Sequence, residues 1–537
     1  MEASTIDPSS RQKLILLPVL LAVAVSASFA QSPAPDDPVA EQGGKFAKIY
    51  ALIEKNYAEP IDPDQAILEA GVRSMLSTLD PFSVFFNTAQ FEQFQQQMRG
   101  RAVGFGTILY VTAGKAVVLQ AAERSPAARA GLGPGDEIVE INGERVARMD
   151  FQTLISTLRR ARSHSVDLGV IHPGKLLPVS IKLNPAQVAT PSVDIAFQLN
   201  PGTAYVHVSS FEAKTPQELL DALNGLGGKD LKGLVLDLRG NHGGAVEAAV
   251  DVVSLFIPPG ARVLTVKGRS AAEKLMTTVP APSSFTFPIV VLVNGETASA
   301  AEITAAALEE HDRAVIAGSP TFGKGLVQSV MPLSEKTGLA LITAQYFTPS
   351  GRSIQRPLPG TALANPQQAD APAGASAESE GSPSFHTDDG RPLTAGGGIT
   401  PDVKIPATAL DPWLQFLAQR GILTNFASDY LTRHGRITNS FEPDDATLED
   451  LRNFLRRNSI LAPDQYWESD KDYLKLHIKV EAFNLVFGLK AGNEVETRGD
   501  PQVQKAASLL LETSKILKPA SGKAALRNSE TPDRTGK

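Results

Sequence analysis

The chain has 537 residues, and at about 150 residues per domain this length predicts three or four folded units. Hydrophobic residues make up 42% and charged residues 20%, which is typical of a soluble globular protein and excludes a largely disordered or polytopic membrane protein. The net charge of −7 provides no basic surface for phosphates, so we expect no nucleic-acid partner. Because the chain contains no cysteine, a thiol nucleophile, a cysteine zinc site and disulfide bonds are excluded. The histidines show no metal-binding spacing, and we expect no metal or other cofactor.

Residues 1–30 have the pattern of a secretory signal peptide. Two basic residues precede an apolar run from Leu14 to Val25, and the small residues Ser28 and Ala30 follow as at a signal peptidase site. The run is too short to span a bilayer comfortably. The sequence therefore predicts export to the periplasm or another extracytoplasmic compartment. The alternative is an uncleaved segment that anchors the protein to the membrane.

Residues 31–100 are predicted to form an N-terminal helical region that caps the rest of the protein. Apolar side chains in its first part recur at helical spacing, and further helices are predicted over Gln65 to Thr78 and Gln90 to Met98. The segment from Leu79 to Ser83 interrupts the helical pattern. The side chains that define the first helix are Phe46, Ile49, Tyr50, Ile53 and Tyr57.

Residues 101–185 have the pattern of a compact β module. Short β-type runs alternate with Gly and Pro turns, and one helix with a single apolar face lies between them. The apolar face comprises Phe151, Leu154, Ile155 and Leu158, and the predicted strands are Thr107 to Val111, Ala116 to Gln120, Glu137 to Ile141, Val166 to Ile171 and Leu177 to Ile181.

Strands and helices alternate over residues 186–358, and the chain returns to the same domain at 396–408. The run from Ile289 to Val293 is wholly apolar, which is typical of a strand buried on both faces of its sheet. Alternation of such strands with helices predicts a largely parallel sheet with helices on both faces. The fold class is therefore predicted to be α/β multidomain.

Three segments complete the domain plan. Residues 359–395 are rich in Ala, Pro, Gln and Ser, which predicts a flexible insertion. Residues 409–517 are predicted to be helical, with Asp411 and Asp500 as N-caps before a proline, and these helices could form a homo-oligomer or bind an adaptor. Residues 518–537 are polar and are predicted to form a disordered tail.

A glycine-rich string in the β module carries the first functional signature. Gly104-Phe105-Gly106-Thr107 is followed by GLGPGDEIVEINGERV at 131–146, and together they resemble a PDZ domain. The resemblance implies a groove between the strand that starts near Gly106 and the predicted helix. In such a groove the C-terminal peptide of a partner adds a strand, and exposed backbone N–H groups bind its carboxylate. Any one of these glycines alone would also suit a plain turn.

Ser299 lies where a buried type of strand passes into a helix. The apolar run 289–293 is followed by NGETASAAEI at 294–303, so Ser299 is placed at the C-terminal end of the strand and the start of the helix. The N–H groups of a first helical turn point to where an oxyanion would form. A serine at this position is also a common helix N-cap. The position alone leaves both interpretations open.

Several further motifs accompany this serine. TFGKGLVQ occurs at 321–328, and the chain also contains LDPFS at 79–83, DLRGNHGG at 237–244, YFTPSGRSIQ at 346–355 and GGGITPDV at 396–403. Together they resemble the tail-specific, or carboxyl-terminal processing, peptidases, a family of serine proteases with an inserted PDZ domain. The resemblance covers about residues 45–405. It implies a protease core related to the ClpP and crotonase class.

The resemblance also implies a role for each matching position. Ser299 is the nucleophile, Lys324 its general base and Gln328 the residue that positions the lysine. The implied function is an exported endopeptidase that binds the free C-terminal tail of a protein substrate. The implied oxyanion hole consists of the backbone N–H groups of Ala300 and of Gly243 or Gly244.

The chemistry of a serine–lysine pair depends on the charge of the amine. An ordinary lysine has a pKa near 10.4 and is protonated at neutral pH, so it cannot accept the serine proton. Burial disfavours the ammonium, and lowering the pKa by about 3 units corresponds to roughly 4 kcal/mol. A neutral amide such as that of Gln328 can hold the amine without stabilising its charge. A Gly-Lys-Gly segment in a plain turn, by contrast, would leave Lys324 solvated and charged.

Three residues depart from the family pattern near the serine. His242 replaces the usual proline, Glu296 stands where glycine is expected, and Ala301 replaces a second serine. We expect His242 to be a bystander, and Asp237 and Arg239 to form a structural ion pair. The departures motivate a second hypothesis, in which the protein binds peptide tails as a scaffold or adaptor but cleaves them weakly or not at all.

Overall fold

A computed structural model of the protein describes residues 38–98, 101–162, 164–269, 272–281, 285–358 and 384–517. The predicted signal peptide, the predicted C-terminal tail and most of the predicted insertion therefore lie outside the described residues. None of the helices in these ranges is both long and apolar enough to cross a bilayer. The chain divides into two units between Ala70 and Gly71.

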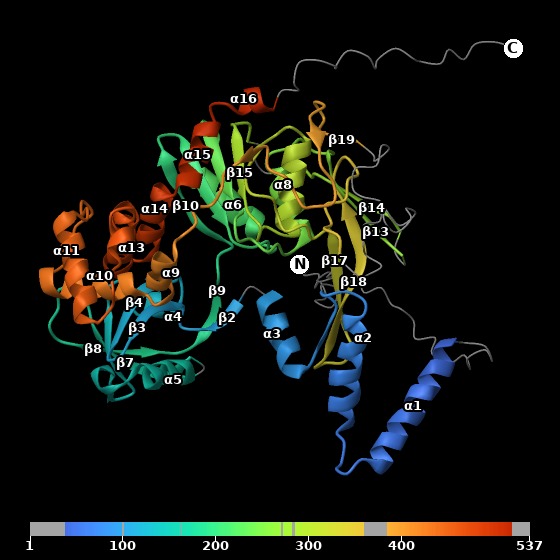
Figure 1. Ribbon diagram of the computed structural model, residues 1–537, viewed down its shortest axis with the longest axis horizontal. Coiled ribbons are helices and arrows are strands. Elements are labelled where there is room, and N and C mark those ends of the chain that lie inside the picture. Colours follow the sequence, from blue (N-terminus) through green and yellow to red (C-terminus); the bar gives the residue numbers. More distant parts are fainter. Residues whose placement is uncertain are drawn as a thin grey trace, which may run out of the picture. The chain divides into compact units, whose positions relative to one another are not determined.

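The described part of the first unit consists mainly of α1 (Pro38–Asn56), shown in Figure 1. Lys45 and Glu41 form an i,i+4 ion pair along its surface, with 2.7 Å between Nζ and Oε1. Four of the five predicted apolar residues of this segment are exposed, from 47% for Ile53 to 66% for Tyr57, and the fifth, Tyr50, is half-buried. A second helix, η2 (Asp64–Val72), begins in this unit. The capping role predicted for residues 31–100 stays a prediction.

A six-stranded sheet forms the centre of the second unit. Its strand order is β10-β11-β12-β15-β16-β21, and all neighbouring strands are parallel except β10 and β11. This agrees with the predicted, largely parallel sheet. The strands are β10 (Val193–Asn200), β11 (Thr203–Val208), β12 (Gly233–Asp237), β15 (Ile289–Val293), β16 (Val315–Gly318) and β21 (Val403–Lys404).

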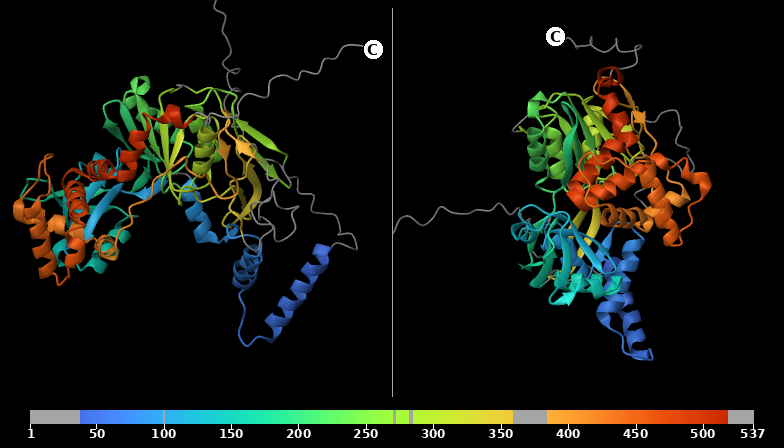
Figure 2. Two further views of the ribbon diagram at one scale, coloured as in Figure 1. Left: turned by 45° about the horizontal axis from the view of Figure 1, so that its top comes forward. Right: turned by 90° about the vertical axis from the view of Figure 1, so that its left-hand side faces the viewer.

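Helices cover both faces of this sheet, and Figures 1 and 2 show them around it. One face packs against α6 (Thr215–Gly225), α7 (Val246–Ser254) and α8 (Ala300–Glu310), whose apolar side chains share a buried core with β11, β12 and β15. The opposite face packs against α15 (Pro501–Leu509) through Val503, Ala506 and Leu509. The wholly apolar β15 is fully buried because both of its faces are covered.

A second sheet, which is antiparallel, was not anticipated from the sequence. Its path is β1-β18-β13-β14, and β17 pairs with β18. In β18 buried and half-buried residues are mixed, so the strand lacks the continuous apolar run that identified β15. The strands are β1 (Val84–Phe86), β13 (Arg262–Gly268), β14 (Lys274–Thr277), β17 (Leu326–Pro332) and β18 (Gly338–Phe347).

The end of the predicted flexible insertion has a defined structure. Within residues 384–395, β19 (Phe385–His386) pairs with β20 (Pro392–Leu393) as a short hairpin. Arg391 lies in this hairpin and forms ion pairs with Asp312 and Asp402, both of which are largely buried. The composition of the segment did not reveal this hairpin or its ion-pair partners, and the flexibility predicted for residues 359–395 stays a prediction.

The β module contains the five predicted strands, each within two residues of its predicted start. The helix α5 (Phe151–Ala161) is capped by Asp150, whose side chain accepts from the Thr153 N–H at 2.7 Å. A separate ribbon joins β2 (Arg101–Gly104) to β9 (Ala186–Ala189), the segments that lead into and out of the module. The module strands are β3 (Thr107–Thr112), β4 (Lys115–Ala121), β5 (Glu137–Ile141), β7 (Val166–Ile171) and β8 (Val179–Leu183).

The C-terminal helices pack against both the β module and the central sheet. α10 (Ile422–His434) and α13 (Lys471–Phe487) cover one side of β4, where Ala427, Ala482 and Leu485 form a buried cluster with Val117. The Lys115 Nζ donates to the Ser428 hydroxyl at 2.8 Å in the same interface. The remaining helices are α9 (Pro412–Gln419), α11 (Asp445–Arg457), α12 (Asp464–Trp467), α14 (Leu489–Gly499) and α16 (Thr513–Ile516).

Candidate active site

Ser299 is the residue that immediately precedes α8, after the loop that follows β15. Its backbone has φ 57° and ψ −118°, a conformation that is unfavourable for a residue with a side chain. Its N–H donates to the Glu302 carboxylate at 2.9 Å. Strained backbone of this kind persists only where the surroundings enforce it, and it is concentrated at functional sites. Ser299 therefore differs from an ordinary N-cap, whose backbone is normally extended.

Lys324 lies in the loop that enters β17 of the antiparallel sheet, so the predicted pair comes from two different sheets. The neighbouring Gly323 has φ 87°, which favours glycine, and a Cβ there would lie only 3.0 Å from the Arg356 Cβ and 3.1 Å from the Gly398 nitrogen. The N–H of Gly325 donates to the buried Gln355 side chain at 2.8 Å. Burial lowers the pKa of the Lys324 amine, while the carboxylates of Asp80 and Glu302 act in the opposite direction.

The Glu302 carboxylate connects the Ser299 and Lys324 segments. It is fully buried and accepts four hydrogen bonds, including the N–H groups of Ser299 and Lys324, each at 2.9 Å. The other two donors are the Gly323 N–H at 2.7 Å and the Thr321 hydroxyl at 2.5 Å. Burial raises the pKa of Glu302, and these hydrogen bonds oppose that rise. One side chain thus fixes the backbone of both residues.

Tyr346, from β18, makes a second connection between the same two residues. Its buried hydroxyl lies 2.6 Å from the Lys324 carbonyl and 3.1 Å from the Ser299 carbonyl. Glu302 therefore binds the N–H groups, and Tyr346 the carbonyl groups, of the proposed nucleophile and base. We call Glu302 and Tyr346 the backbone clamp.

Gln328 and Lys324 both contact Phe82, which belongs to the LDPFS turn. The Lys324 Nζ lies 4.9 Å from the centroid of the Phe82 ring, a cation–π contact. The exposed Gln328 side chain donates from Nε2 to the Phe82 carbonyl at 2.7 Å. The turn itself is held by Asp80, which accepts from the N–H groups of Phe82 and Ser83 at 2.7 Å. Gln328 is predicted to hold the lysine, but the contact that its side chain makes here is with the Phe82 carbonyl.

The segment 240–244 brings Gly243 against Ser299. A Cβ on Gly243 would lie 2.8 Å from the Ser299 Cβ, and one on Gly244 would lie 2.0 Å from the Phe211 carbonyl oxygen. Both positions therefore require glycine. The Gly243 N–H donates to the Asn241 side chain at 2.8 Å. Within the described residues the N–H groups of Gly244 and Ala300 have no hydrogen-bond partner, whereas that of Gly243 has one, and the oxyanion role of these amides stays a prediction.

The glycine segment and the serine loop are bonded to each other. The Gly240 N–H donates to the Asn294 side chain at 3.0 Å, and the Ala298 N–H donates to the Asn241 carbonyl at 2.9 Å. His242, the next residue in the sequence, has an exposed side chain that takes no part in these contacts. The relative position of Ser299 and the free amides is therefore fixed by backbone and amide contacts.

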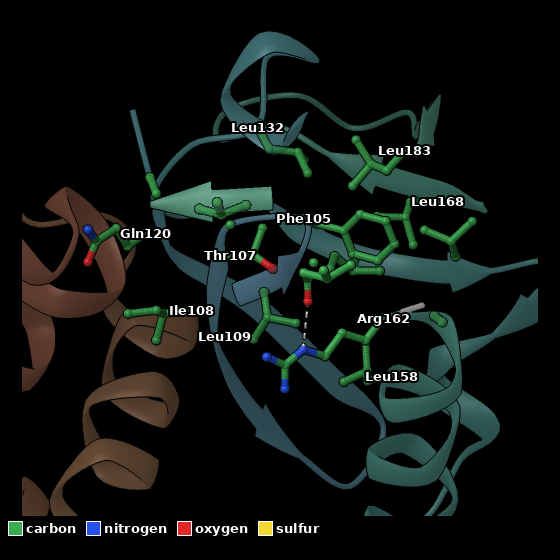
Figure 3. Close-up of a pocket in the computed structure, with 18 of the residues that line it drawn as sticks. Phe105, Thr107, Ile108, Leu109, Gln120, Leu132, Leu158, Arg162, Leu168 and Leu183 are labelled. Carbon is green, nitrogen blue, oxygen red and sulfur yellow. Dashed lines mark hydrogen bonds between the residues drawn. The ribbon is translucent and has the colours of Figure 1, made fainter. Parts of the chain in front are cut away.

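A groove in the β module is the second candidate site. It has a volume of about 460 Å³ and is lined by Gly104, Phe105, Gly106 and Thr107 together with side chains from β3 and α5. Figure 3 shows Phe105, Leu158 and Leu168 around it, with Arg162 at one end. The Arg162 Nε donates to the Val103 carbonyl at 3.2 Å. The apolar lining suits an apolar peptide side chain.

Comparison with known protein families gives two matches. Residues 202–361 match the model described as peptidase family S41, and residues 117–171 match the PDZ domain. A carboxy-terminal-processing protease of Bartonella bacilliformis is 31% identical over 320 residues, which cover 59% of this chain and 73% of that protein. The chain belongs to peptidase family S41. Its β module is a PDZ domain.

Two further processing proteases match a similar share of the chain. A carboxy-terminal processing protease of Bacillus subtilis is 30% identical over 316 residues, which cover 58% of this chain. The chain spans 65% of that relative, just under two thirds of its length. Among solved structures, the photosystem II D1 C-terminal processing protease is 29% identical, with a TM-score of 0.35, and the match covers 59% of this chain and 85% of that one.

The S41 site includes residues that sequence reasoning did not single out. Glu302 follows Ser299 by three positions, a spacing typical of a capping box, and that signal was available. Tyr346 and Phe82 lie within the quoted motifs YFTPSGRSIQ and LDPFS, but no pattern assigned either of them to the site. Asn241 lies in the DLRGNHGG motif without a predicted role. These residues became visible only when the two sheets were placed together.

Proposed function

We propose that this S41 family member is an exported serine endopeptidase that cleaves protein substrates after binding their free C-terminal tails. The observation that carries the proposal is the backbone clamp, in which Glu302 and Tyr346 each bond to both Ser299 and Lys324. Burying two polar side chains costs free energy. Their use to hold one serine and one lysine is therefore expected only if that serine and that lysine must act together. A serine–lysine pair is a known way to activate a hydroxyl nucleophile.

In the proposed reaction, the Ser299 Oγ attacks the peptide carbonyl carbon while the Lys324 amine takes its proton. The negative oxygen forms beside the Gly244 and Ala300 amides, which stabilise it. The leaving amine then takes the proton from Lys324, which leaves an acyl ester on Ser299. Water, deprotonated by Lys324, hydrolyses this ester and regenerates the serine. The amide of Gln328 would hold the lysine only after leaving the Phe82 carbonyl.

The PDZ groove is proposed to bind the substrate tail. Residues 104–107 line a largely apolar groove, which suits a terminal carboxylate followed by an apolar side chain. The same proposal includes export by residues 1–30 and a core related to the ClpP and crotonase class. It also includes the N-terminal cap and the domain boundaries at 100, 185 and 408. So does the use of the C-terminal helices to bind an adaptor or a second copy.

A second candidate function is a tail-binding scaffold with weak cleavage. The observation that favours it is the position of Phe82, which covers Lys324 and holds Gln328 through its carbonyl. A cation–π contact stabilises the charged amine and so opposes its use as a base. The two functions differ in what happens to a bound peptide.

The test is cleavage of a peptide that ends in a free apolar carboxylate. We expect the purified protein to cleave it, and the Ser299→Ala variant to lose cleavage by at least about 10³-fold while it still binds the peptide. Mass spectrometry of the products and fluorescence anisotropy measure the two properties separately. Equal cleavage by both proteins would reject the proposed function. Tight binding with no turnover by either would favour the scaffold.

A further prediction concerns the pH dependence of cleavage. Phe82→Leu removes the cation–π contact, which is worth roughly 0.5–1 kcal/mol, from the charged form of Lys324. The pKa of the base should fall by about 0.5 units. Because the neutral amine is the active form, kcat/KM rises with pH through this pKa, and its acidic limb should move to lower pH. A pH profile of kcat/KM measures the shift, and an unchanged or upward shift would contradict it.

A further inference from the structure

Arg239 joins the C-terminal helices to the central sheet at the end of β12. Its guanidinium bonds to the buried Asp237 carboxylate, with 2.6 Å between Nη2 and Oδ2. Its Nη1 lies 2.8 Å from the Asp500 carboxylate and donates to the Gln502 side-chain oxygen at 2.7 Å. The predicted ion pair with Asp237 is present, but it is one half of a larger cluster. The second half comes from a region outside the family match.

Asp500 and Gln502 lie at the start of α15 and are firmly held there. Asp500 is the N-cap of the helix, and its carboxylate also accepts from the Gln502 N–H at 2.7 Å. The Gln502 side chain is 8% exposed and donates from Nε2 to the Ile405 carbonyl at 2.7 Å. The helix behind them packs its apolar side chains into the sheet. Asp500 and Gln502 therefore present two fixed acceptors to Arg239.

Arg239, which Asp500 and Gln502 hold, lies at the start of the segment that reaches Ser299. Gly240, which follows Arg239, donates its N–H to Asn294, and Asn241 donates from its side chain to the Val208 carbonyl at 2.6 Å. The segment ends at Gly243, which packs against Ser299, and at Gly244, which packs against Phe211. The Arg239 carbonyl is also 3.1 Å from His207 Nε2. The start of the glycine segment thus has a side-chain anchor in α15, and its end carries the free amide.

We propose that Asp500 and Gln502 are positioning residues for the proposed oxyanion amides, which makes the C-terminal helical region part of the catalytic apparatus. They act through Arg239 and contact no substrate. This inference rests on the proposed function, because it assigns a role in the same reaction. It predicts that weakening the Arg239 contacts changes the rate of cleavage and leaves peptide binding in the PDZ groove unchanged.

The test combines kinetics with hydrogen–deuterium exchange on the full-length protein. Asp500→Asn keeps a good N-cap but removes the charge, and Gln502→Met keeps the length of the side chain but removes its acceptor. Asp445→Asn is the matched control, since Asp445 also forms an ion pair within the C-terminal helices, with Lys475. We expect each test variant to lower kcat by about 5- to 50-fold at unchanged KM, whereas the control keeps wild-type values.

Exchange separates this inference from the proposed function, because it needs no turnover. We expect amides in residues 239–245 to exchange about 10-fold faster in Asp500→Asn and Gln502→Met, with the rest of the central sheet unchanged. If both variants exchange the amides of this segment at the same rate as the wild-type protein, the proposal is overturned, whether or not the protein cleaves peptides. Faster exchange throughout the sheet would also overturn it, because that result indicates lost packing of α15 and not local positioning.

Discussion

Replacing Glu302 with glutamine is expected to lower kcat for peptide cleavage by at least about 100-fold. The carboxylate accepts hydrogen bonds from four donors, and an amide offers a single oxygen and turns an NH₂ group toward the remaining N–H groups. The Ser299 and Lys324 segments would then separate, and a displacement of about 1 Å between reacting groups costs roughly 10²-fold in rate.

The same substitution is expected to destabilise the protein by roughly 2–4 kcal/mol, because each buried donor left without a partner costs about 1–3 kcal/mol. Chemical denaturation measures this loss, and steady-state kinetics on the folded fraction measures the rate. Glu335→Gln, an identical chemical change in an exposed loop, serves as the control and should alter neither value. Wild-type cleavage by Glu302→Gln would show that the clamp does not position the reacting residues.

Replacing Lys324 with methionine should also lower cleavage, but without the loss of stability expected for Glu302→Gln. Cleavage at neutral pH is expected to fall by about 10²- to 10⁴-fold, which is the range for loss of a general base. The melting temperature is not expected to fall, because the substitution removes a charge whose burial lowers its pKa and leaves an apolar chain of similar length. Calorimetry and peptide cleavage on the same sample test the two effects together.

The pH profile distinguishes a lost base from a distorted site. In the wild-type protein, burial lowers the pKa of Lys324, so the acidic limb of kcat/KM should lie below the usual range of lysine titration. Residual cleavage in Lys324→Met should lack this limb. A Lys324→Met variant that retains both the wild-type limb and the wild-type rate would assign the base to a different group.

The part of the site on β15 and α8 was predictable because patterns of neighbouring residues indicate both the strand and the helix. The run 289–293 is apolar throughout, and the residues after it change to helical spacing, so Ser299 could be placed at the junction from sequence. Structure confirms the strand with identical ends and begins the helix at Ala300. The N-caps Asp411 and Asp500 were predictable for the same reason, since a cap is a contact between residues two or three positions apart.

The remaining contacts connect residues that are distant in sequence and have no shared pattern. Arg239 meets Gln502 across 263 positions, and Gln328 meets Phe82 across 246. Tyr346 lies in β18, where buried and half-buried residues are mixed. The sequence therefore gives no clear pattern that identifies this strand or shows which way its side chains point. Neither composition nor periodicity states which strands of the second sheet face α8. The clamp and the Arg239 cluster thus depend on tertiary structure and were not available from the sequence.

The packing of the C-terminal helices also has a mechanical consequence. The helices α10 and α13 share a buried core with the PDZ strand β4, while α15 shares one with the central sheet. Any swing of the PDZ domain would carry the first group along and leave α15 behind. The helix α14 is also bonded to the central sheet, because Arg498 donates to the Leu199 carbonyl at 2.6 Å, so the hinge of such a movement would fall at Gly488, between α13 and α14. Such a movement would therefore strain the connection between α13 and α14, while the junction of α14 and α15 at Asp500 would keep its hold on Arg239.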